Sequence, residues 1–440
     1  MIIKIASSFF DQKSNLMLAM KSCCITLLTE SERQHRNSEV CGMPVINRVA
    51  EMQEAVAEWR RYLHEYPELL YDVHQTAAFV AQKLQSFGCD VVETGIGRTG
   101  VVGIIKGKLT DGPVIGLRAD MDALPIFETS GKPWASKVPG KAHSCGHDGH
   151  TAMLLGASQY LAETRNFNGS IALIFQPAEE GGGGALAMIN DGFMDKYSIK
   201  EVYGMHNEPK LPIGQFAIRK GPVMAAADSF EITVRGRGGH AAQPHRSVDP
   251  VLAAAHIVIA LQSIVSRETD PLNSLVITVA STNGGDANNV IPDFVKMTGT
   301  VRTLLPQIRD FAEKRLNEVA QATATAHSAT AEVTYQRGYP VTFNHDLETD
   351  FAEDIARKVA GDKAVNASMP PHMGAEDFSY MLEERPGAFL FIGNGDTANL
   401  HNAAYDFNDE ALGYGISYWV TLAETALPMV VNQPQASALN

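Results

Sequence analysis

The sequence predicts an α/β fold with helices on both faces of a sheet, interrupted by a small α+β domain. In the first half of the chain, short apolar segments alternate with amphipathic ones, a pattern typical of α/β sheets. From Met224 the pattern changes to two strands and a helix, repeated, and after Tyr339 the first pattern returns. At 440 residues the chain is too long for one ordinary core. We therefore expect one domain in two parts, 43–223 and 337–440, with residues 224–336 inserted between them.

The first part is expected to begin with two helices. Apolar residues recur at three- and four-residue steps from residue 49, and Pro67 ends that helix. A second helix over 76–87 stops at Gly88, a residue typical of helix C-termini. The segments that follow are strands at 101–107 and 114–117, a loop and helix over 144–163, a strand, loop and helix over 170–192, and a strand and loop over 201–209.

The inserted domain and the closing part have patterns of their own. The inserted domain is expected to contain strands near 228–235, 275–283, 294–303 and 330–337, with helices over 250–265 and 306–326. The closing part is expected to contain a helix near 350–359, an apolar strand over 386–395 and a final helix.

Composition excludes several functional classes. The net charge of −14 and the lack of basic runs disfavour nucleic acid as a partner. No apolar run reaches the ~20 residues that a membrane span needs, and five cysteines are too few for a disulfide framework in so long a chain. We therefore expect a cytoplasmic protein that acts on a small molecule.

The first 42 residues differ from the rest of the chain. Asp11, Lys13 and Lys21 interrupt the early apolar stretch, and the segment from Ser31 to Cys41 is polar and without pattern. We expect residues 1–42 to be a disordered or wrongly included extension. A secretory leader is the alternative interpretation.

Polar clusters follow the predicted strands. Open α/β sheets carry their active sites beyond the carboxyl ends of the strands, so we expect these clusters to meet. They contain Asp120 and Asp122, then Cys145, His147, Asp148 and His150, then Glu179 and Glu180, then His206, and finally His401.

The Cys145-x-His147 spacing suits a metal ion. A thiolate and an imidazole two residues apart can reach one site from a tight loop, and borderline-soft divalent ions accept such ligands. The alternative is a buried structural cysteine beside capping histidines. A single His206 or His401 would also more often be structural, and only the combination of clusters favours a metal centre.

Glu179 and Glu180 are the more informative pair. Adjacent carboxylates repel each other unless a cation compensates them. If one binds a metal ion, the other is free to act as a general base on water. The glycines at 181–184 give the backbone freedom for a close approach. A solvated acidic loop is the alternative.

A set of motifs together resembles one family: RADMDALP, CGHDGHTAM, QPAEEGGGGA, GMHNEP, RGRGGHAAQPH, NVIPD, GTVRT, MGAEDFS and LHNAAYDFND. They are similar to the hippurate hydrolase and auxin-conjugate (IAA-amino acid) hydrolase branch of the aminoacylase–carboxypeptidase G metallohydrolase superfamily, over about residues 45–427. The resemblance implies a zinc-peptidase-like α/β catalytic domain with an inserted α+β lid domain. It also implies a homodimer or homotetramer formed through that lid.

Carried over residue by residue, the resemblance implies two divalent metal ions (Mn, Zn, Co or Ni), a general base and a substrate-binding pair in the lid. The implied ligands are Cys145, His147, Glu180, His206 and His401. Glu179 would be the base, and Asp122 would orient a ligand. His240 would bind substrate and stabilise the oxyanion, and Asn289 would hold the substrate carboxylate. The wider superfamily has a histidine ligand where this chain has Asp120. This departure fits the branch in which Cys145 is a ligand, so the resemblance does not imply that Asp120 binds metal.

The resemblance implies a metal-dependent amidohydrolase that splits small N-acyl amino acids into a carboxylic acid and a free amino acid. An N-acetyl-diamino acid deacetylase or a dipeptidase with the same chemistry is the alternative. Two hypotheses come from other classes: a cysteine hydrolase with Cys145 as nucleophile, and a metal-dependent binding protein. A thiol enzyme would survive EDTA, and a binding protein would have no need of Glu179.

Overall fold

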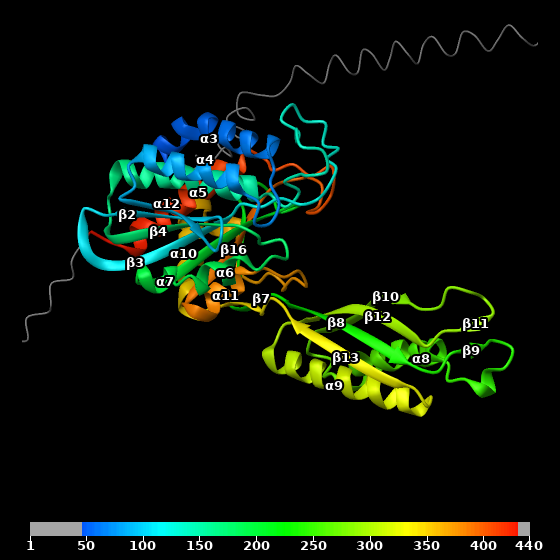
Figure 1. The fold of residues 1–440 in the computed structure, drawn as a ribbon. Coiled ribbons are helices and arrows are strands. Elements are labelled where there is room, and N and C mark those ends of the chain that lie inside the picture. The colour runs from blue at the N-terminus through cyan, green and yellow to red at the C-terminus, as the bar shows by residue number, and fades with distance from the viewer. Residues whose placement is uncertain (1–45, 430–440) are drawn as a thin grey trace, which may run out of the picture. The chain divides into compact units, whose positions relative to one another are not determined.

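The computed structural model describes residues 46–429, so the expectation for residues 1–42 lies outside the described part of the chain. The strands in that part form an eight-stranded sheet, a four-stranded sheet and two short pairs. Figure 1 shows that helices lie against each of the two larger sheets.

The large sheet has the order β1-β2-β4-β3-β5-β16-β6-β15. Its centre is parallel, because β3 pairs in parallel with β4 and β5, and β5 pairs in parallel with β16. The β2 strand is antiparallel to both β1 and β4. The bounds are β1 (Val91–Ile96), β2 (Gly100–Lys106), β3 (Leu109–Asp120), β4 (Asn168–Gln176), β5 (Ile199–Glu208), β6 (Phe216–Ala217), β15 (Val365–Asn366) and β16 (Gly387–Gly393).

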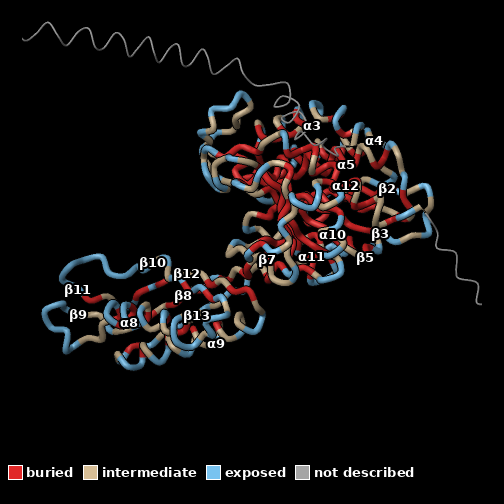
Figure 2. Tube along the Cα trace, turned by 180° about the vertical axis from the view of Figure 1, so that it is seen from behind, coloured by how far each residue is buried: buried red, intermediate tan, exposed pale blue. Residues whose placement is uncertain are grey.

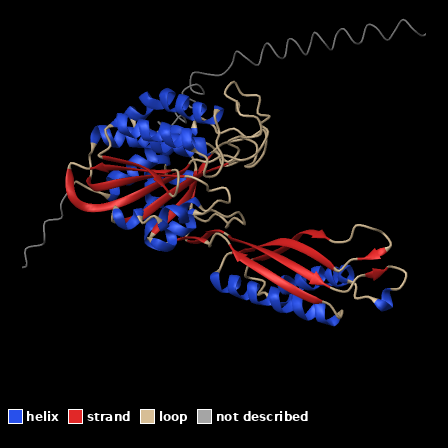
Figure 3. Ribbon diagram, viewed as in Figure 1, coloured by secondary structure: helices blue, strands red, loops and turns tan. Residues whose placement is uncertain are grey.

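Helices cover both faces of this sheet, as the sequence predicts (Figure 3). The alternation along β4 gives the reason, because Ile171 and Leu173 pack into one core whereas Ala172 and Ile174 pack into the other. The first core includes α3 (Asn47–Glu65), α4 (His74–Phe87), α5 (His147–Thr164), α10 (Asp346–Ala360) and α12 (Ala411–Ala426). The second includes α6 (Gly184–Asn190), α7 (Phe193–Lys196) and α11 (Phe378–Glu384).

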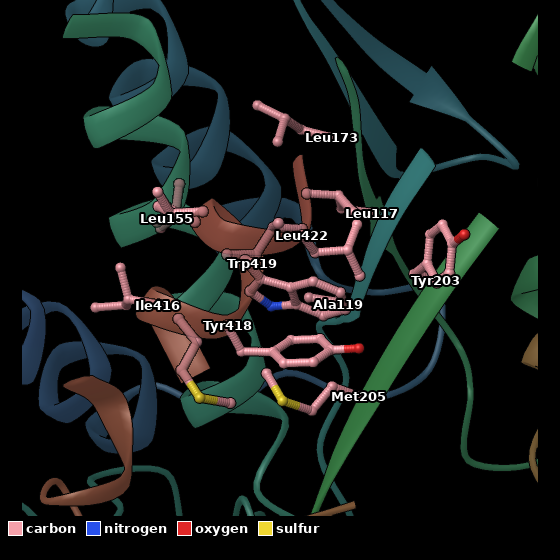
Figure 4. Close-up of a cluster of buried hydrophobic side chains, with 14 of the residues drawn as sticks. Leu117, Ala119, Leu155, Leu173, Tyr203, Met205, Ile416, Tyr418, Trp419 and Leu422 are labelled. Carbon is pink, nitrogen blue, oxygen red and sulfur yellow. The ribbon is translucent and has the colours of Figure 1, made fainter. Parts of the chain in front are cut away.

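Segments that lie far apart in the sequence pack together in the first core. Trp419 and Tyr418 of α12 pack in the same cluster as Leu117 of β3 and Leu155 of α5 (Figure 4). Trp419 is only 1% exposed. Truncation of so large a buried side chain typically costs about 3–5 kcal/mol. The second part of the chain is therefore needed to stabilise the first.

The smaller sheet has a core of its own (Figure 2). It is antiparallel, with the order β10-β12-β8-β13. Phe230, Ile232 and Val234 alternate along β8 toward two covering helices, which is the pattern of a sheet with one covered face. The elements are β8 (Ala226–Arg235), β9 (Gly239–His240), η1 (Pro244–Arg246), α8 (Pro250–Ser263), η2 (Ile264–Glu268), β10 (Leu275–Asn283), β11 (Val290–Ile291), β12 (Phe294–Thr303), α9 (Pro306–Ala326) and β13 (Thr330–Arg337).

One described helix, Pro250–Glu268, is long and apolar enough to cross a membrane by composition alone. Its side chains Ala253, Ile257 and Leu261 pack into the core of the smaller sheet. A buried face of this kind is what an ordinary core helix has. The composition of this helix is therefore explained by the core that it covers.

A two-stranded pair joins the smaller sheet to the rest of the chain. The β7 strand (Gly221–Met224) pairs antiparallel with β14 (Thr342–Asn344). The chain therefore leaves toward β8 and returns from β13 at neighbouring positions. We call this pair and the adjoining residues 337–341 the hinge segment. The remaining short element is η3 (Asp362–Ala364).

The described strands differ from the sequence-based expectation in several places. The short strands β6, β7, β9, β11, β14 and β15 were not predicted. Two longer strands, β1 and β3, also differ. The β1 strand was not predicted, because its residues VVETGI contain a glycine and a glutamate and only Ile96 among them is buried. The β3 strand extends from Leu109 to Asp120 rather than covering only 114–117. The polar residues at both ends of β3 interrupt the apolar pattern, so the predicted strand was too short.

Candidate metal centre

The carboxyl ends of parallel strands gather most of the predicted site residues at one edge of the large sheet. The strands β4, β3, β5 and β16 are successive neighbours and run parallel, so their carboxyl ends meet. The residues at or just after these ends are Asp120 and Asp122 (β3), Glu179 and Glu180 (β4) and His206 (β5). His401 lies further along the chain from β16, and its backbone N–H donates to the carbonyl oxygen of Ser144 at 2.8 Å.

A glycine brings the loop that contains Cys145 to the same edge of the sheet. Gly146 precedes α5 with a left-handed φ of 93°. A Cβ at this position would lie 2.2 Å from Nδ2 of Asn207, which follows His206 in β5. Only glycine allows this approach, and it places Cys145 and His147 against β5.

Cys145, His147 and His206 form a first group of donor atoms. Their candidate ligand atoms all lie within 4.8 Å of one another, and Sγ of Cys145 is 3.4 Å from Nε2 of His206. Nδ1 of His147 is 2.8 Å from the carbonyl oxygen of Asp122. That contact turns Nε2 of His147 into the site, where it has no hydrogen-bond partner among residues 46–429.

Cys145, Glu180 and His401 form a second group, again within 4.8 Å. Oε1 of Glu180 is 3.4 Å from Nε2 of His401, and it too lacks a hydrogen-bond partner in the described chain. Because Cys145 belongs to both groups, its sulfur lies between them. The arrangement can hold two cations that share one thiolate.

Burial shifts the pKa values of the side chains in the two donor groups. It raises the pKa of the Cys145 thiol well above its usual range, and Glu180 and Glu179 act in the same direction. Burial and the neighbouring His150 hold the pKa of His206 well below its usual range, so this ring offers a lone pair. A divalent cation would reverse the preference of Cys145, because it favours thiolate over thiol. This set of sulfur, nitrogen and oxygen donors fits a borderline-soft divalent ion.

Neighbouring carboxylates favour the charged form of His147. Burial opposes the charge, but attraction by Asp120 and the contact with Asp122 outweigh it and raise the pKa of His147 to about 10. A cation at Nε2 would take the place of that proton, since a ligating imidazole is neutral.

Asp122 holds together the loop that contains Cys145 (the cysteine loop) and the loop that contains Glu179 and Glu180 (the glutamate loop). Its fully buried carboxylate accepts hydrogen bonds from the backbone N–H of Glu179 (2.9 Å) and of Glu180 (3.1 Å). Its Oδ1 is also 3.5 Å from Nδ1 of His147. The Asp122 carboxylate therefore links the backbone of Glu179 and Glu180 to the His147 side chain.

The carboxyl group of Glu179 lies in a strongly acidic environment. It is 7% exposed, and its candidate ligand atom lies within 4.8 Å of those of Glu376 and Asp377. Burial raises its pKa well above the usual range, and Glu376, Glu180 and Asp377 add to the effect. Such a group retains a proton near neutral pH more readily than an ordinary glutamate, which suits proton transfer.

Arg118 compensates this acidic cluster, and the sequence-based reasoning missed it. The buried guanidinium lies 2.7 Å from Asp120, 2.8 Å from Glu376 and 3.1 Å from Asp377. The signal was present in the sequence, because Arg118 is the one basic residue in the apolar run VIGLRAD.

Asp120 and His150 form, with His147, a competing group of possible ligands. Oδ1 of Asp120 is 2.6 Å from Nδ1 of His150, and Nε2 of His150 accepts from the backbone N–H of Asn207 at 2.9 Å. Both nitrogens of His150 are therefore engaged by the protein. Because Asp120 also binds Arg118, we regard Asp120 and His150 as structural support for His147.

His240 and Asn289 are brought together elsewhere, beside the smaller sheet. β9 pairs with β11, which places His240 opposite Val290, and Ala241 N–H donates to the Asn289 carbonyl at 3.0 Å. Both side chains are exposed. Within residues 46–429 neither of them contacts Cys145 or Glu179.

A sheet covered on both faces, with histidines, carboxylates and a cysteine gathered at its carboxyl edge, defines a hydrolase with the architecture of a metallopeptidase. The chain belongs to peptidase family M20/M25/M40, whose model matches residues 116–425. The predicted resemblance is thereby confirmed at the level of the family.

Individual relatives point to the same branch. Hippurate hydrolase of Campylobacter jejuni is 43% identical over 381 residues, which cover 87% of this chain and 99% of the relative. N-acetyl-L-cysteine deacetylase of Bacillus subtilis is 42% identical over 354 residues, covering 80% and 83%. A crystal structure described as a dinuclear metal binding peptidase of the M20 family, from Bacillus subtilis, has a TM-score of 0.76 and 33% identity and covers 87% and 100%.

Proposed function

We propose that this protein is a two-metal amidohydrolase that splits small N-acyl amino acids into a carboxylic acid and a free amino acid. The observation that carries the proposal is the pair of donor groups that share Cys145, with the carboxyl group of Glu179 beside them. In this proposal one cation is held by Cys145, His147 and His206, and the other by Cys145, Glu180 and His401. The solved dinuclear relative supports the number of metal ions.

The side chains divide the chemical steps among them. Glu179 takes a proton from the attacking water and later delivers it to the leaving amine. His240 donates a hydrogen bond to the oxyanion that forms on the substrate carbonyl, and Asn289 holds the substrate carboxylate. The bound metal ions supply Lewis acidity, which lowers the pKa of water and polarises the carbonyl.

The relatives support an N-acyl amino acid as the substrate class. Hippurate and N-acetylcysteine differ in both the acyl group and the amino acid, but both contain an amide next to a free α-carboxylate. We therefore place the specificity of the class in recognition of that carboxylate. An N-acetyl-diamino acid or a dipeptide would use the same chemistry.

We further propose that residues 224–336 form the lid and dimerisation domain of a cytoplasmic homodimer or homotetramer. His240 and Asn289 are exposed and separate from the metal centre within one chain. Supply of these residues by the partner subunit would complete each active site.

The cysteine hydrolase hypothesis has less support. A nucleophilic cysteine needs a lowered pKa, whereas burial raises the pKa of the Cys145 thiol. That hypothesis would also leave Glu180 and His401 without a function.

The test is a substrate screen on metal-free protein reconstituted separately with Mn²⁺, Zn²⁺, Co²⁺ and Ni²⁺. Hippurate, N-acetylcysteine, an N-acetyl-diamino acid and a dipeptide are the four substrates. We expect metal-dependent release of free amino acid from hippurate or N-acetylcysteine. Cleavage of the dipeptide alone would replace the proposed substrate class. Full activity after EDTA treatment would contradict the metal mechanism.

A further inference from the structure

Tyr339 contacts the glutamate loop directly from the hinge segment. Its hydroxyl donates to the carbonyl oxygen of Glu179 at 2.6 Å and accepts from the backbone N–H of Gly183 at 3.0 Å. One hydroxyl thus binds both ends of the turn that carries Glu179. Two hydrogen bonds on one turn restrict the direction in which the Glu179 side chain leaves the backbone.

The residue before Tyr339 is fixed by the smaller sheet. Gly338 donates its N–H to Asp228 of β8 at 3.0 Å, and its carbonyl oxygen accepts from Arg309 of α9 at 2.9 Å. Arg309 also binds the carboxylate of Asp228, which is 3% exposed. A Cβ at Gly338 would lie 2.3 Å from the carbonyl oxygen of Ala227, so the contact with β8 requires glycine.

We propose that Tyr339 is a positioning residue that makes the placement of Glu179 depend on how the hinge segment is anchored to the smaller sheet. The chain of contacts runs from Arg309 and Asp228 through Gly338 to the Tyr339 hydroxyl, and from there to the Glu179 backbone. The inference rests on the proposed role of Glu179 as the base. It assigns to Tyr339 no contact with substrate or metal.

The chain offers a matched control on the same turn. The hydroxyl of Tyr71 donates to the carbonyl oxygen of Gly182 at 2.8 Å. The Cζ atom of Arg98 lies over the Tyr71 ring, 4.1 Å from the ring centroid. Tyr71 lies between α3 and α4, far along the chain from the hinge segment. It therefore holds the turn without linking it to Arg309.

The test is a double-mutant cycle in metal-loaded enzyme, with kcat and KM for hippurate as the measurement, or for N-acetylcysteine if hippurate is not cleaved. Arg309→Lys keeps a cation beside Asp228 but shortens the reach to the Gly338 carbonyl. We expect it to lower kcat by about 3–10-fold with KM within about threefold, because a small misplacement of a reacting group costs rate. In the Tyr339→Phe background the same substitution should change kcat by less than about twofold, since the link is already lost. In the Tyr71→Phe background its full effect should persist.

The outcomes separate this inference from the proposed function. Equal effects of Arg309→Lys in all three backgrounds, or no effect on kcat in the wild type, would overturn the role of Tyr339. Glu179→Gln is measured in the same series, and full activity of that variant would overturn the base assignment together with this inference.

A second measurement does not depend on the stability of Tyr339→Phe. Amide hydrogen exchange over residues 177–186 should be faster in Arg309→Lys than in the wild type, because a looser hinge segment frees the Gly183 N–H. Unchanged exchange over that segment would contradict the coupling.

Discussion

Sγ of Cys145 lies 3.4 Å from Nε2 of His206, although 61 positions separate the two residues in the chain. The contact depends on Gly146, which lets the cysteine loop lie against β5. The same sulfur belongs to the group that contains Glu180 and His401. Cys145 is therefore the residue whose loss should affect both proposed metal positions at once.

Cys145→Ala should reduce bound metal at both positions and lower kcat by at least ~10²-fold, by the loss of a ligand common to both. The fold should survive, because the substitution removes one buried sulfur atom. The measurements are metal content per chain, kcat and the melting temperature. Cys89→Ala is the matched control, since Cys89 is half-buried and lies outside both donor groups. A Cys145→Ala protein with normal metal content would contradict the ligand assignment.

Glu179→Gln and Glu180→Gln should have different defects. Glu179→Gln keeps the shape of the side chain but cannot accept the proton, so kcat should fall by at least ~10²-fold while metal content stays normal. Glu180→Gln removes an anionic ligand and should lower metal occupancy. Metal analysis beside steady-state kinetics on both proteins distinguishes them.

The opposite pattern would exchange the two roles. A metal-free Glu179→Gln beside a metal-loaded Glu180→Gln would assign the base to Glu180. Normal activity in both variants would contradict the two-metal mechanism itself.

His240→Ala should lower kcat by about 10²–10³-fold, the usual cost of losing one donor to an oxyanion. Metal content and melting temperature should not change, because His240 is exposed and outside the metal centre. If the residue acts in the partner subunit, mixing His240→Ala with Glu179→Gln chains should restore roughly a quarter of the wild-type sites by random pairing in a dimer. Mixed chains that stay inactive would place His240 in its own subunit's site.

His64 should make the stability of the protein depend on pH. Its ring nitrogens lie 2.8 Å from Asp148 and 3.2 Å from Glu128, so the geometry suits the imidazolium. Burial opposes that charge, but the attraction of Asp148 and the hydrogen bonds to both carboxylates outweigh it and raise the pKa of His64 to about 9.

Since the pKa of His64 is higher in the folded than in the unfolded chain, its contribution is complete below about pH 6.5 and is lost as the pH rises through about 9. The upper bound of that contribution is about 3 kcal/mol. The melting temperature of metal-loaded protein should therefore fall more steeply between pH 6.5 and 9.5 in the wild type than in His64→Gln. Parallel curves for the two proteins would contradict a charged His64.

Local patterns were sufficient to predict most of the fold. The helix expected over 306–326 is α9 (Pro306–Ala326), because a proline at its start and an amphipathic repeat both mark it. The β1 strand was not predicted, because it is an edge strand with no apolar run in which only Ile96 is buried. Short edge strands depend on their neighbour for pairing and so have a weak signal of their own.

The supports of the candidate site could not be predicted, because they depend on long-range contacts. Arg60 is fully buried and binds Asp148, 88 positions away, and Asp409, 349 positions away. Nothing in the local helix pattern distinguishes Arg60 from Arg61, which is partly exposed. The position of His240 relative to Glu179 is a question of domain and subunit arrangement, which local pattern does not determine.

Because the donor groups combine Cys145 with residues far along the chain, the site can be completed only late in synthesis of the protein on the ribosome. More than 200 residues separate Cys145 from His401, so synthesis at about 5–20 residues per second takes roughly 10–50 s between the two. During that time the nascent chain presents a thiol, imidazoles and paired carboxylates without their final partners, and α12 has not yet closed the core. We therefore expect metal loading to be a late, post-translational event, and chains that terminate before His401 to emerge as metal-poor targets for proteolysis.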